Sequence, residues 1–276
     1  MEWHLNIPKI LHVYWGGSIL PFLRYKTIDT FMKLNPDWQV MFWYPKHPGT
    51  IVTWETKPLD YKLDCEDFTP MLMGLPIGKN AIDFEDFGFR NTMSEVHKSD
   101  FLRYHLLTTY GGVWSDMDIL FFKPITGLKV NKPENKDIET FVCICWYGHS
   151  NGFFLSAKGS KFFEKMASLS IKGFNANDYL CLGPTLCNNH YPTLESINAF
   201  SPALDIGMEA VYAHDCYQMI VSYGNNSQSR FTDDSIGIHW YAASQECGHF
   251  LKYTKGGTTN LPDNVLGRLL KNISYV

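Results

Sequence analysis

The stretch SDFLRYHLLTTYGGVWSDMDILFFKPI, residues 99–125, decides what fold this chain is expected to have. A run of helix-forming residues starts at Ser94 and ends at Gly111-Gly112, and glycine is the residue that most often ends a helix. An apolar run, VWSDMDILFF at 113–122, follows at once and stops before a proline. We therefore predict a helix, a tight turn and a buried strand in direct succession.

Two carboxylates, Asp116 and Asp118, interrupt the apolar run. Residues two apart on a strand project from the same face, so both side chains are expected on one face. Burying two unpaired carboxylates costs several kcal/mol each, so either basic side chains or a divalent cation must compensate them. Oxygen ligands suit Mg²⁺ or Mn²⁺ rather than copper or zinc, and substrate phosphates often complete such a site.

Asp100 and Arg103 lie three apart on the preceding helix and therefore share a face. One interpretation is a surface ion pair that contributes less than about 1 kcal/mol. The helix is mostly apolar, however, and the Gly-Gly turn connects it directly to the Asp116–Asp118 strand. Both side chains can therefore lie near the two carboxylates, where they would hold sugar hydroxyls or phosphate.

The N-terminal region has the pattern of a nucleotide-binding βαβ unit. IPKILHVYW at 7–15 is a β-rich apolar run that ends at Gly16-Gly17. A helix is predicted over 21–34 and a second strand over 38–44, which completes strand, helix and strand. The first strand thus ends where glycines let a ligand approach the backbone closely.

Trp15 stands at the carboxyl end of the first predicted strand, the edge at which open α/β sheets bind ligands. It fits a base-stacking ring, and it also fits an ordinary core ring. Further strands are predicted at 141–146, 152–157, 211–217 and 235–242, and helices around 160–170, near 178–190 and over 261–272. Loops and one or two short helices are predicted over 45–93. The fold class is therefore α/β, with a mixed sheet flanked by helices.

Composition excludes several classes of protein. The 276 residues are 45% hydrophobic and 19% charged with a net charge of −4, which excludes a disordered chain and a basic nucleic-acid clamp. Aromatic residues make up 15%, and their flat faces suit sugars and bases. GLPIGKN at 74–80 fails the phosphate-loop pattern because Asn80 replaces the required Ser or Thr.

The cysteines and the N-terminus indicate a cytoplasmic protein. The seven cysteines form no CxxC pair, and Cys143 and Cys145 are expected to be buried free thiols. No apolar run approaches the length of a membrane span, and the first residues lack the pattern of a signal peptide.

Residues 99–125 resemble the signature segment of the DXD-containing sugar transferases, which has the form SDxxRxxxLxxxGGxYxDxDxxxxKP. This chain differs from it only by Trp114 at the usual Tyr position. The group includes fungal initiating mannosyltransferases, α-1,4-glycosyltransferases and the catalytic domains of large clostridial glucosylating toxins. Further similar elements are IPKILHVYWGG (7–17), NPDW (35–38), Gly183-Pro184 and IHWYAAS (238–244).

The resemblance implies a GT-A (Rossmann-like) fold as a single domain over 1–276. Residues 1–125 would be the half that binds the nucleotide-sugar. Residues 126–276 would be the acceptor-binding half, with a C-terminal element of the metal shell. It also implies a divalent metal, Mn²⁺ or Mg²⁺, and retention of the anomeric configuration. The irregular segments 45–93 and 172–200 are where acceptor specificity is expected, and four aspartates are candidates for acceptor contacts: Asp178, Asp205, Asp233 and Asp234.

By position in the family pattern, Asp116 and Asp118 are the catalytic carboxylates and Asp118 and His239 the metal ligands. Asp116 would contact the donor ribose and metal-bound water. The donor-binding residues are Trp15, Gly16, Asp100, Arg103 and Asp116. The chain has Gln245 where the family has a tryptophan after Ser244, and His239 alternatively fits a hydrogen-bonded core histidine.

The expected function is metal-dependent transfer of a sugar from a nucleotide-sugar to a hydroxyl of a glycan or glycoprotein. UDP-sugars are favoured as donors and GDP-sugars are the alternative, in polysaccharide or glycoprotein-glycan synthesis, with no nucleic-acid partner. Two other functions stay open. A metal-dependent phosphohydrolase would need more clustered carboxylates and histidines, and a lectin-like protein would bind glycans without catalysis.

Overall fold

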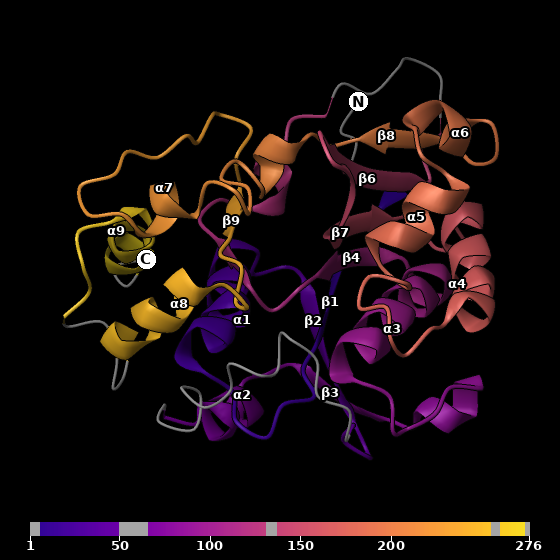
Figure 1. Cartoon of the computed structure of the whole chain (residues 1–276), viewed down its shortest axis with the longest axis horizontal. Coiled ribbons are helices and arrows are strands. Elements are labelled where there is room, and N and C mark those ends of the chain that lie inside the picture. Colours follow the sequence, from indigo (N-terminus) through magenta and orange to yellow (C-terminus); the bar gives the residue numbers. More distant parts are fainter. Residues whose placement is uncertain (1–5, 50–65, 131–136, 255–259, 274–276) are drawn as a thin grey trace.

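The computed structural model describes residues 6–49, 66–130, 137–254 and 260–273. Within them, seven strands form one sheet in the order β3-β2-β1-β4-β7-β6-β8 (Figure 1). The strands are β1 (Ile10–Tyr14), β2 (Gln39–Pro45), β3 (Gly78–Ile82), β4 (Gly112–Ser115), β6 (Thr140–Cys145), β7 (Gly148–Ser156) and β8 (Ala203–Asp205). Parallel pairing joins β3, β2, β1 and β4, whereas β7 is antiparallel to both β4 and β6. The expected α/β fold class, a mixed sheet flanked by helices, is confirmed.

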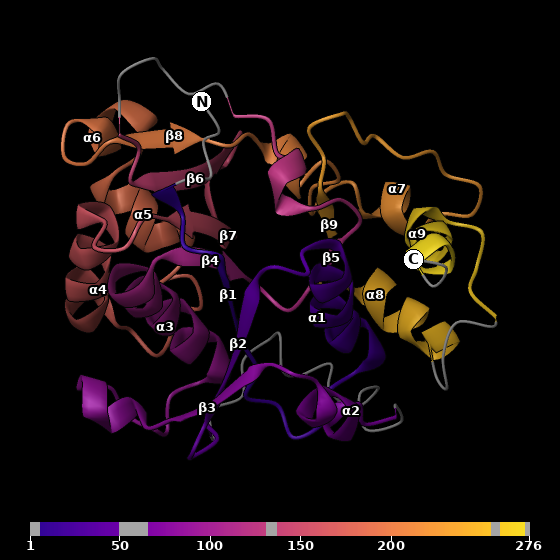
Figure 2. The ribbon, with the colours of Figure 1, turned by 180° about the vertical axis from the view of Figure 1, so that it is seen from behind.

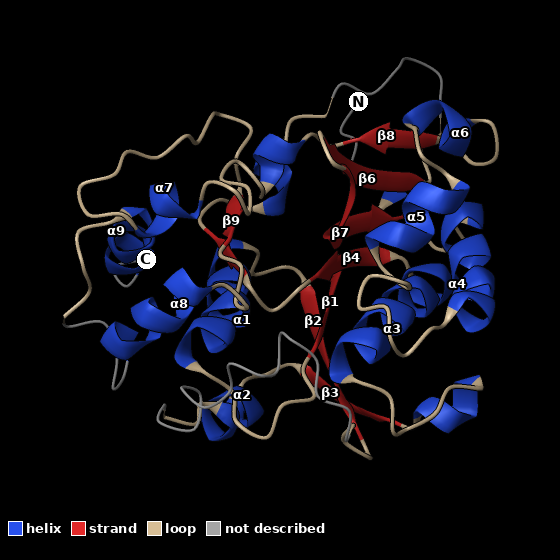
Figure 3. Ribbon diagram, viewed as in Figure 1, coloured by secondary structure: helices blue, strands red, loops and turns tan. Residues whose placement is uncertain are grey.

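Helices cover both faces of this sheet (Figures 1 and 3). On one side lie α3 (Glu95–Tyr110), α4 (Lys161–Gly173) and α5 (Pro184–His190), and on the other lie α1 (Phe22–Leu34) and α8 (Gln245–Phe250). Figure 2 shows the same two layers from behind. The shorter helices are α2 (Thr69–Gly74), α6 (Leu194–Asn198) and α7 (Met219–Tyr223). The last helix of the described residues is α9 (Val265–Ile273).

Alternation along the central strands builds two hydrophobic cores. In β4, Val113 packs into the core on the α1 side and Trp114 into the core on the α3 side. In β7, Phe153 packs into the core on the α1 side and Phe154 into the core on the α3 side. The central strands are thus buried on both faces, which accounts for their nearly continuous apolar sequences.

The junction between α3 and β4 forms as the sequence predicts. The Ser94 side chain caps α3 by accepting a hydrogen bond from the His97 amide at 3.3 Å. At the other end, Gly111 and Gly112 have φ angles of 67° and 96°. A Cβ on Gly112 would lie 2.4 Å from the Ile10 carbonyl oxygen, so close packing against β1 also requires glycine there.

The prediction of one strand over 113–122 is wrong. β4 ends at Ser115, and β5 (Ile119–Phe121) begins a separate two-stranded sheet with β9 (Gly237–His239). Asp116 and Asp118 therefore lie in the turn between two sheets and not on one face of a strand. Three contacts with distant residues hold this turn: the Asp116 amide donates to the Gly152 carbonyl at 2.7 Å, Thr27 Oγ1 to the Met117 carbonyl at 2.9 Å, and the Trp240 amide to the Asp118 carbonyl at 2.9 Å.

Other predictions differ from the structure at the sheet edges and in the C-terminal half. Residues 211–217 are turns and not a strand, and the strand predicted over 235–242 is limited to β9. The helix near 178–190 is limited to α5. β3 follows Ile77 inside the segment predicted as loops and short helices, part of which (50–65) lies outside the described residues. No helix among the described residues is long and apolar enough to cross a membrane.

Candidate active site

The residues to which the sequence assigns a catalytic, donor-binding or metal-binding role line one cavity of about 590 Å³. They are Trp15, Gly16, Asp100, Arg103, Asp116, Asp118 and His239. Trp15 directly follows β1 and Asp116 directly follows β4, two neighbouring parallel strands. The cavity thus lies at the carboxyl edge of the sheet, where α/β folds bind ligands.

Asp118 and His239 are in direct contact across the small sheet. Asp118 Oδ1 lies 3.1 Å from His239 Nε2, and Asp118 Oδ2 accepts a hydrogen bond from the Ala242 amide at 3.0 Å. Burial alone would raise the pKa of the Asp118 carboxyl, but His239, Arg24 and the Ala242 amide hold that pKa well below its usual range. Asp118 is therefore a buried carboxylate that stays charged.

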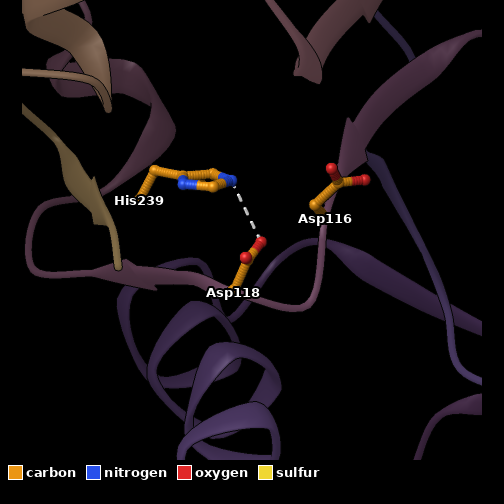
Figure 4. A group of neighbouring side chains, drawn as sticks. All are labelled: Asp116, Asp118 and His239. Carbon is orange, nitrogen blue, oxygen red and sulfur yellow. Dashed lines mark ion pairs between the residues drawn. The ribbon is translucent and has the colours of Figure 1, made fainter. Parts of the chain in front are cut away.

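Asp116 lies beside this pair and completes a group of three neighbouring side chains (Figure 4). One oxygen of Asp116, one oxygen of Asp118 and one imidazole nitrogen of His239 all lie within 4.8 Å of one another. In the described part of the chain, this is the one group of three or more His, Cys, Asp or Glu side chains with such spacing. Two carboxylate oxygens and one imidazole nitrogen could hold a divalent cation such as Mn²⁺ or Mg²⁺.

Arg103 joins the helix α3 to the same carboxylates. Its Nη2 lies 2.7 Å from Asp100 Oδ1 and 3.2 Å from Asp116 Oδ1, and its Nη1 donates to the Asn151 carbonyl. Burial would lower the pKa of Arg103, but Asp116 and Asp100 together raise it. The side chains of Arg103 and Asp100 are 3% and 7% exposed, so the surface ion-pair interpretation is wrong.

Two further contacts fix this cluster. The Asn151 amide group donates to Asp100 Oδ1 at 3.0 Å, and the Trp114 indole donates to Asp116 Oδ1 at 2.9 Å. The Arg103 guanidinium also lies 5.1 Å from the centre of the Trp114 ring. Asp116 is thus held by a basic side chain, whereas Asp118 faces the imidazole of His239.

Trp15 is half-buried and lines the same cavity. Its indole nitrogen donates to the Ile19 carbonyl at 3.0 Å, and the Arg24 guanidinium lies 4.2 Å from the centre of its ring. Gly16 and Gly17 pack too closely for any side chain. A Cβ on Gly16 would lie 1.7 Å from Glu95 Oε2, and one on Gly17 would lie 2.4 Å from Trp15 Cζ2.

Residues 21–137 match the family described as "Glycosyltransferase sugar-binding region containing DXD motif". The chain is similar to DXD-containing sugar transferases. This confirms the resemblance of residues 99–125. The matched region includes Asp100, Arg103 and the DXD motif, Asp116–Asp118, whereas Trp15 and His239 lie outside it.

Known proteins similar to this chain include further glycosyltransferases. The chain is 23% identical over 220 residues to the O-glycosyltransferase braB of Annulohypoxylon truncatum. The matched region covers 73% of this chain and 47% of the relative. This chain therefore matches about half the length of that protein. Among solved structures, the PaToxG glycosyltransferase has 20% identity and a TM-score of 0.46, covering 70% of this chain and 73% of that one. The galactosyltransferase LgtC has 12% identity and a TM-score of 0.48, covering 97% and 96%.

Several cavity residues beside the DXD motif carry no local sequence signal. Asn151 and Gly152 belong to β7, and antiparallel pairing of β7 with β4 places them next to Asp116. Tyr241 adopts a φ of 47°, and its ring centre lies 4.2 Å from that of His239. A pairing register and a positive φ depend on the whole fold, so the sequence of these segments does not reveal them.

The four aspartates considered for acceptor contacts do not line the cavity among the described residues. Asp205 accepts hydrogen bonds from the Ile144 amide of β6 and from the Gly207 amide, and Asp178 accepts one from the Leu180 amide. Asp233 and Asp234 lie near Lys129. The segment 172–200 nevertheless contributes Tyr179, Leu180 and Pro184 to the cavity wall.

Proposed function

We propose that this protein is a metal-dependent retaining glycosyltransferase that moves a sugar from a nucleotide-sugar to a hydroxyl of a glycan or glycoprotein. The observation that carries the proposal is the convergence of Asp116, Asp118 and His239 on one space within a cavity at the carboxyl edge of the sheet. The family match over 21–137 supports it, because the match contains both DXD carboxylates.

In this proposal Asp118 and His239 hold Mn²⁺, and Asp116 contacts the donor ribose and water around the ion. A bound divalent ion would act as a Lewis acid on the diphosphate that leaves. Arg103 keeps Asp100 and Asp116 in place, and Trp15 and Gly16 form the wall against which the base would lie. UDP-sugars are the first donors to test and GDP-sugars the second.

The bond changes of the transfer require no dedicated general base. The bond from the anomeric carbon to the diphosphate oxygen breaks, the acceptor oxygen bonds to that carbon, and the acceptor proton passes to the departing phosphate. This is supported by three carboxylates that line the cavity, because each already has a side-chain partner. Asp100 pairs with Arg103, Asp118 contacts His239, and Glu95 accepts hydrogen bonds from the Tyr14 hydroxyl and the Lys98 ammonium group.

The proposed donor site predicts that UDP stabilises the protein in the presence of Mn²⁺ but much less in its absence. At about 100 times Kd a ligand contributes about 2.7 kcal/mol, which corresponds to a rise of several degrees in Tm. Differential scanning fluorimetry with UDP, Mn²⁺, both, and both with a chelator measures this. A shift with UDP that ignores the chelator would contradict the metal-dependent site.

The test of the transfer itself is release of UDP from a radiolabelled UDP-sugar with and without acceptor saccharides. Release that depends on acceptor supports a transferase. Release of the same size without acceptor indicates a phosphohydrolase. Saccharide binding without release, unchanged by chelator, indicates a lectin-like protein.

Gly152 offers a test of how closely Asp116 must be placed. A Cβ on Gly152 would lie 2.7 Å from Tyr212 Oη and 2.9 Å from Asp116 Oδ2, so Gly152→Ala must displace both of them. We expect kcat/KM to fall about tenfold or more, with a stability loss of about 1–3 kcal/mol from overpacking. Gly74→Ala is the control, since no atom lies within 4 Å of a Cβ there. Equal kcat/KM in both variants would show that Asp116 tolerates displacement.

A further inference from the structure

Two large aromatic side chains stand exposed beside the cavity. Trp146 is 65% exposed and Tyr217 is 76% exposed, and their ring centres lie 5.3 Å apart. A single exposed ring on a protein surface needs no explanation, but two in contact that come from segments 71 residues apart do. We call Trp146 and Tyr217 the aromatic platform.

Trp146 lies in the turn between β6 and β7. Cys145 pairs with Gly148, so Trp146 and Tyr147 form the tip of a tight hairpin. Gly148 has a φ of 106°, and a Cβ there would lie 2.6 Å from Asn188 Oδ1 of α5. The same Asn188 oxygen accepts a hydrogen bond from the His149 amide at 3.0 Å. The tip therefore has little freedom to rearrange.

A buried carboxylate ties the two halves of the platform together. Asp215 is 3% exposed, and its Oδ2 accepts a hydrogen bond from the Trp146 indole at 3.3 Å. Its other oxygen accepts from the Tyr217 amide at 2.8 Å. Both aromatic residues are thus positioned before any ligand binds, which reduces the entropy that binding costs.

The platform is continuous with the candidate active site. Tyr147 and Cys216, the chain neighbours of Trp146 and Tyr217, both line the cavity. The Trp146 and Tyr147 ring centres are 5.2 Å apart. Tyr241, which also lines the cavity, has its ring centre 4.2 Å from that of His239. Aromatic residues therefore extend from the candidate metal site to the rim.

We propose that the aromatic platform binds a neutral pyranose ring of the acceptor, so that the acceptor is a carbohydrate. This inference rests on the proposed function. The C–H face of a pyranose packs against an aromatic face, whose negative charge density attracts those hydrogens. The charges of the cavity support a neutral acceptor. Among the described lining residues the Arg and Lys side chains are Arg24, over the Trp15 ring, and Arg103, paired with Asp100 and Asp116.

The test measures the binding of neutral sugars by saturation-transfer NMR in the presence of UDP and Mg²⁺. The probes are the methyl glycosides of glucose, galactose and N-acetylglucosamine, together with lactose and an unglycosylated peptide rich in Ser and Tyr. For the sugar that binds the wild-type protein, we expect Trp146→Ala/Tyr217→Ala to raise Kd about tenfold or more. Trp146→Phe keeps a ring and should lose less.

Tyr253→Ala is the matched control, because Tyr253 is 48% exposed and does not line the cavity. It should leave the sugar Kd unchanged. An equal Kd in the double variant and the wild type, or no binding of any sugar in the panel, overturns the inference. Peptide binding that requires Trp146 and Tyr217 also overturns it in favour of a protein acceptor. Failure of the proposed function is detected separately by differential scanning fluorimetry, as the absence of a Tm shift with UDP and Mn²⁺.

Discussion

Replacing Asp118 with asparagine is expected to abolish sugar transfer, with a loss of roughly 10²–10³-fold or more in kcat. The substitution removes one negative charge and keeps the size of the side chain. A neutral amide is a poor ligand for a hard divalent ion, so the charge that develops on the leaving diphosphate would lose its stabilisation.

The fold should survive this substitution because both direct side-chain contacts of Asp118 have an equivalent in asparagine. An amide oxygen can accept the hydrogen bond from the Ala242 amide that Oδ2 now accepts at 3.0 Å. The amide nitrogen can donate to Nε2 of a neutral His239, which now lies 3.1 Å from Oδ1. Loss of activity can therefore be separated from loss of structure.

Three measurements check the Asp118→Asn result: transfer rate, circular dichroism and the effect of Mn²⁺ on Tm. The matched control is Asp233→Asn, because the Asp233 side chain is 93% exposed and pairs only at the surface with Lys129. The control should keep wild-type turnover. If Asp118→Asn also turns over normally with an unchanged response to Mn²⁺, Asp118 is not the metal ligand.

The sequence of residues 94–125 predicts the helix, the glycine turn and the proximity of Arg103 to Asp116 because their signals are local. A serine cap, two glycines and an apolar strand are read from neighbouring residues. The turn at Asp116–Asp118 could not be predicted in the same way. It depends on hydrogen bonds with Thr27, Gly152 and Trp240, which are distant in sequence.

The edge strands show the same limit. β3 has the sequence GKNAI, in which only Ile82 is buried, so it lacks the alternating apolar pattern of a half-buried strand. It forms because β2 provides a parallel partner along its whole length. Conversely, VYAHDCY at 211–217 has the apolar content of a strand, but its buried residues pack in turns. Burial and pairing, not residue preference, decide these segments.

Removing the charge of Arg103 is expected to cause a large loss of stability. Arg103→Leu leaves Asp100 and Asp116 without their common partner, and Asp100 is 5% exposed. Breaking a buried ion pair by removing one partner typically costs about 3–5 kcal/mol. Urea unfolding should show this loss, whereas Lys9→Leu, which breaks the exposed pair with Asp37, should leave the stability almost unchanged.

A second substitution separates charge from packing in this effect. Adding Asp100→Asn to Arg103→Leu removes one of the two stranded charges with almost no change in volume. If charge causes the loss, the double variant should be more stable than Arg103→Leu alone. Mn²⁺ should then restore further stability to the double variant, because it neutralises the remaining charge on Asp116. If the double variant is equally unstable and insensitive to Mn²⁺, the loss comes from the contact of Arg103 with the Trp114 ring. In that case Arg103 supports the site by packing rather than by its charge.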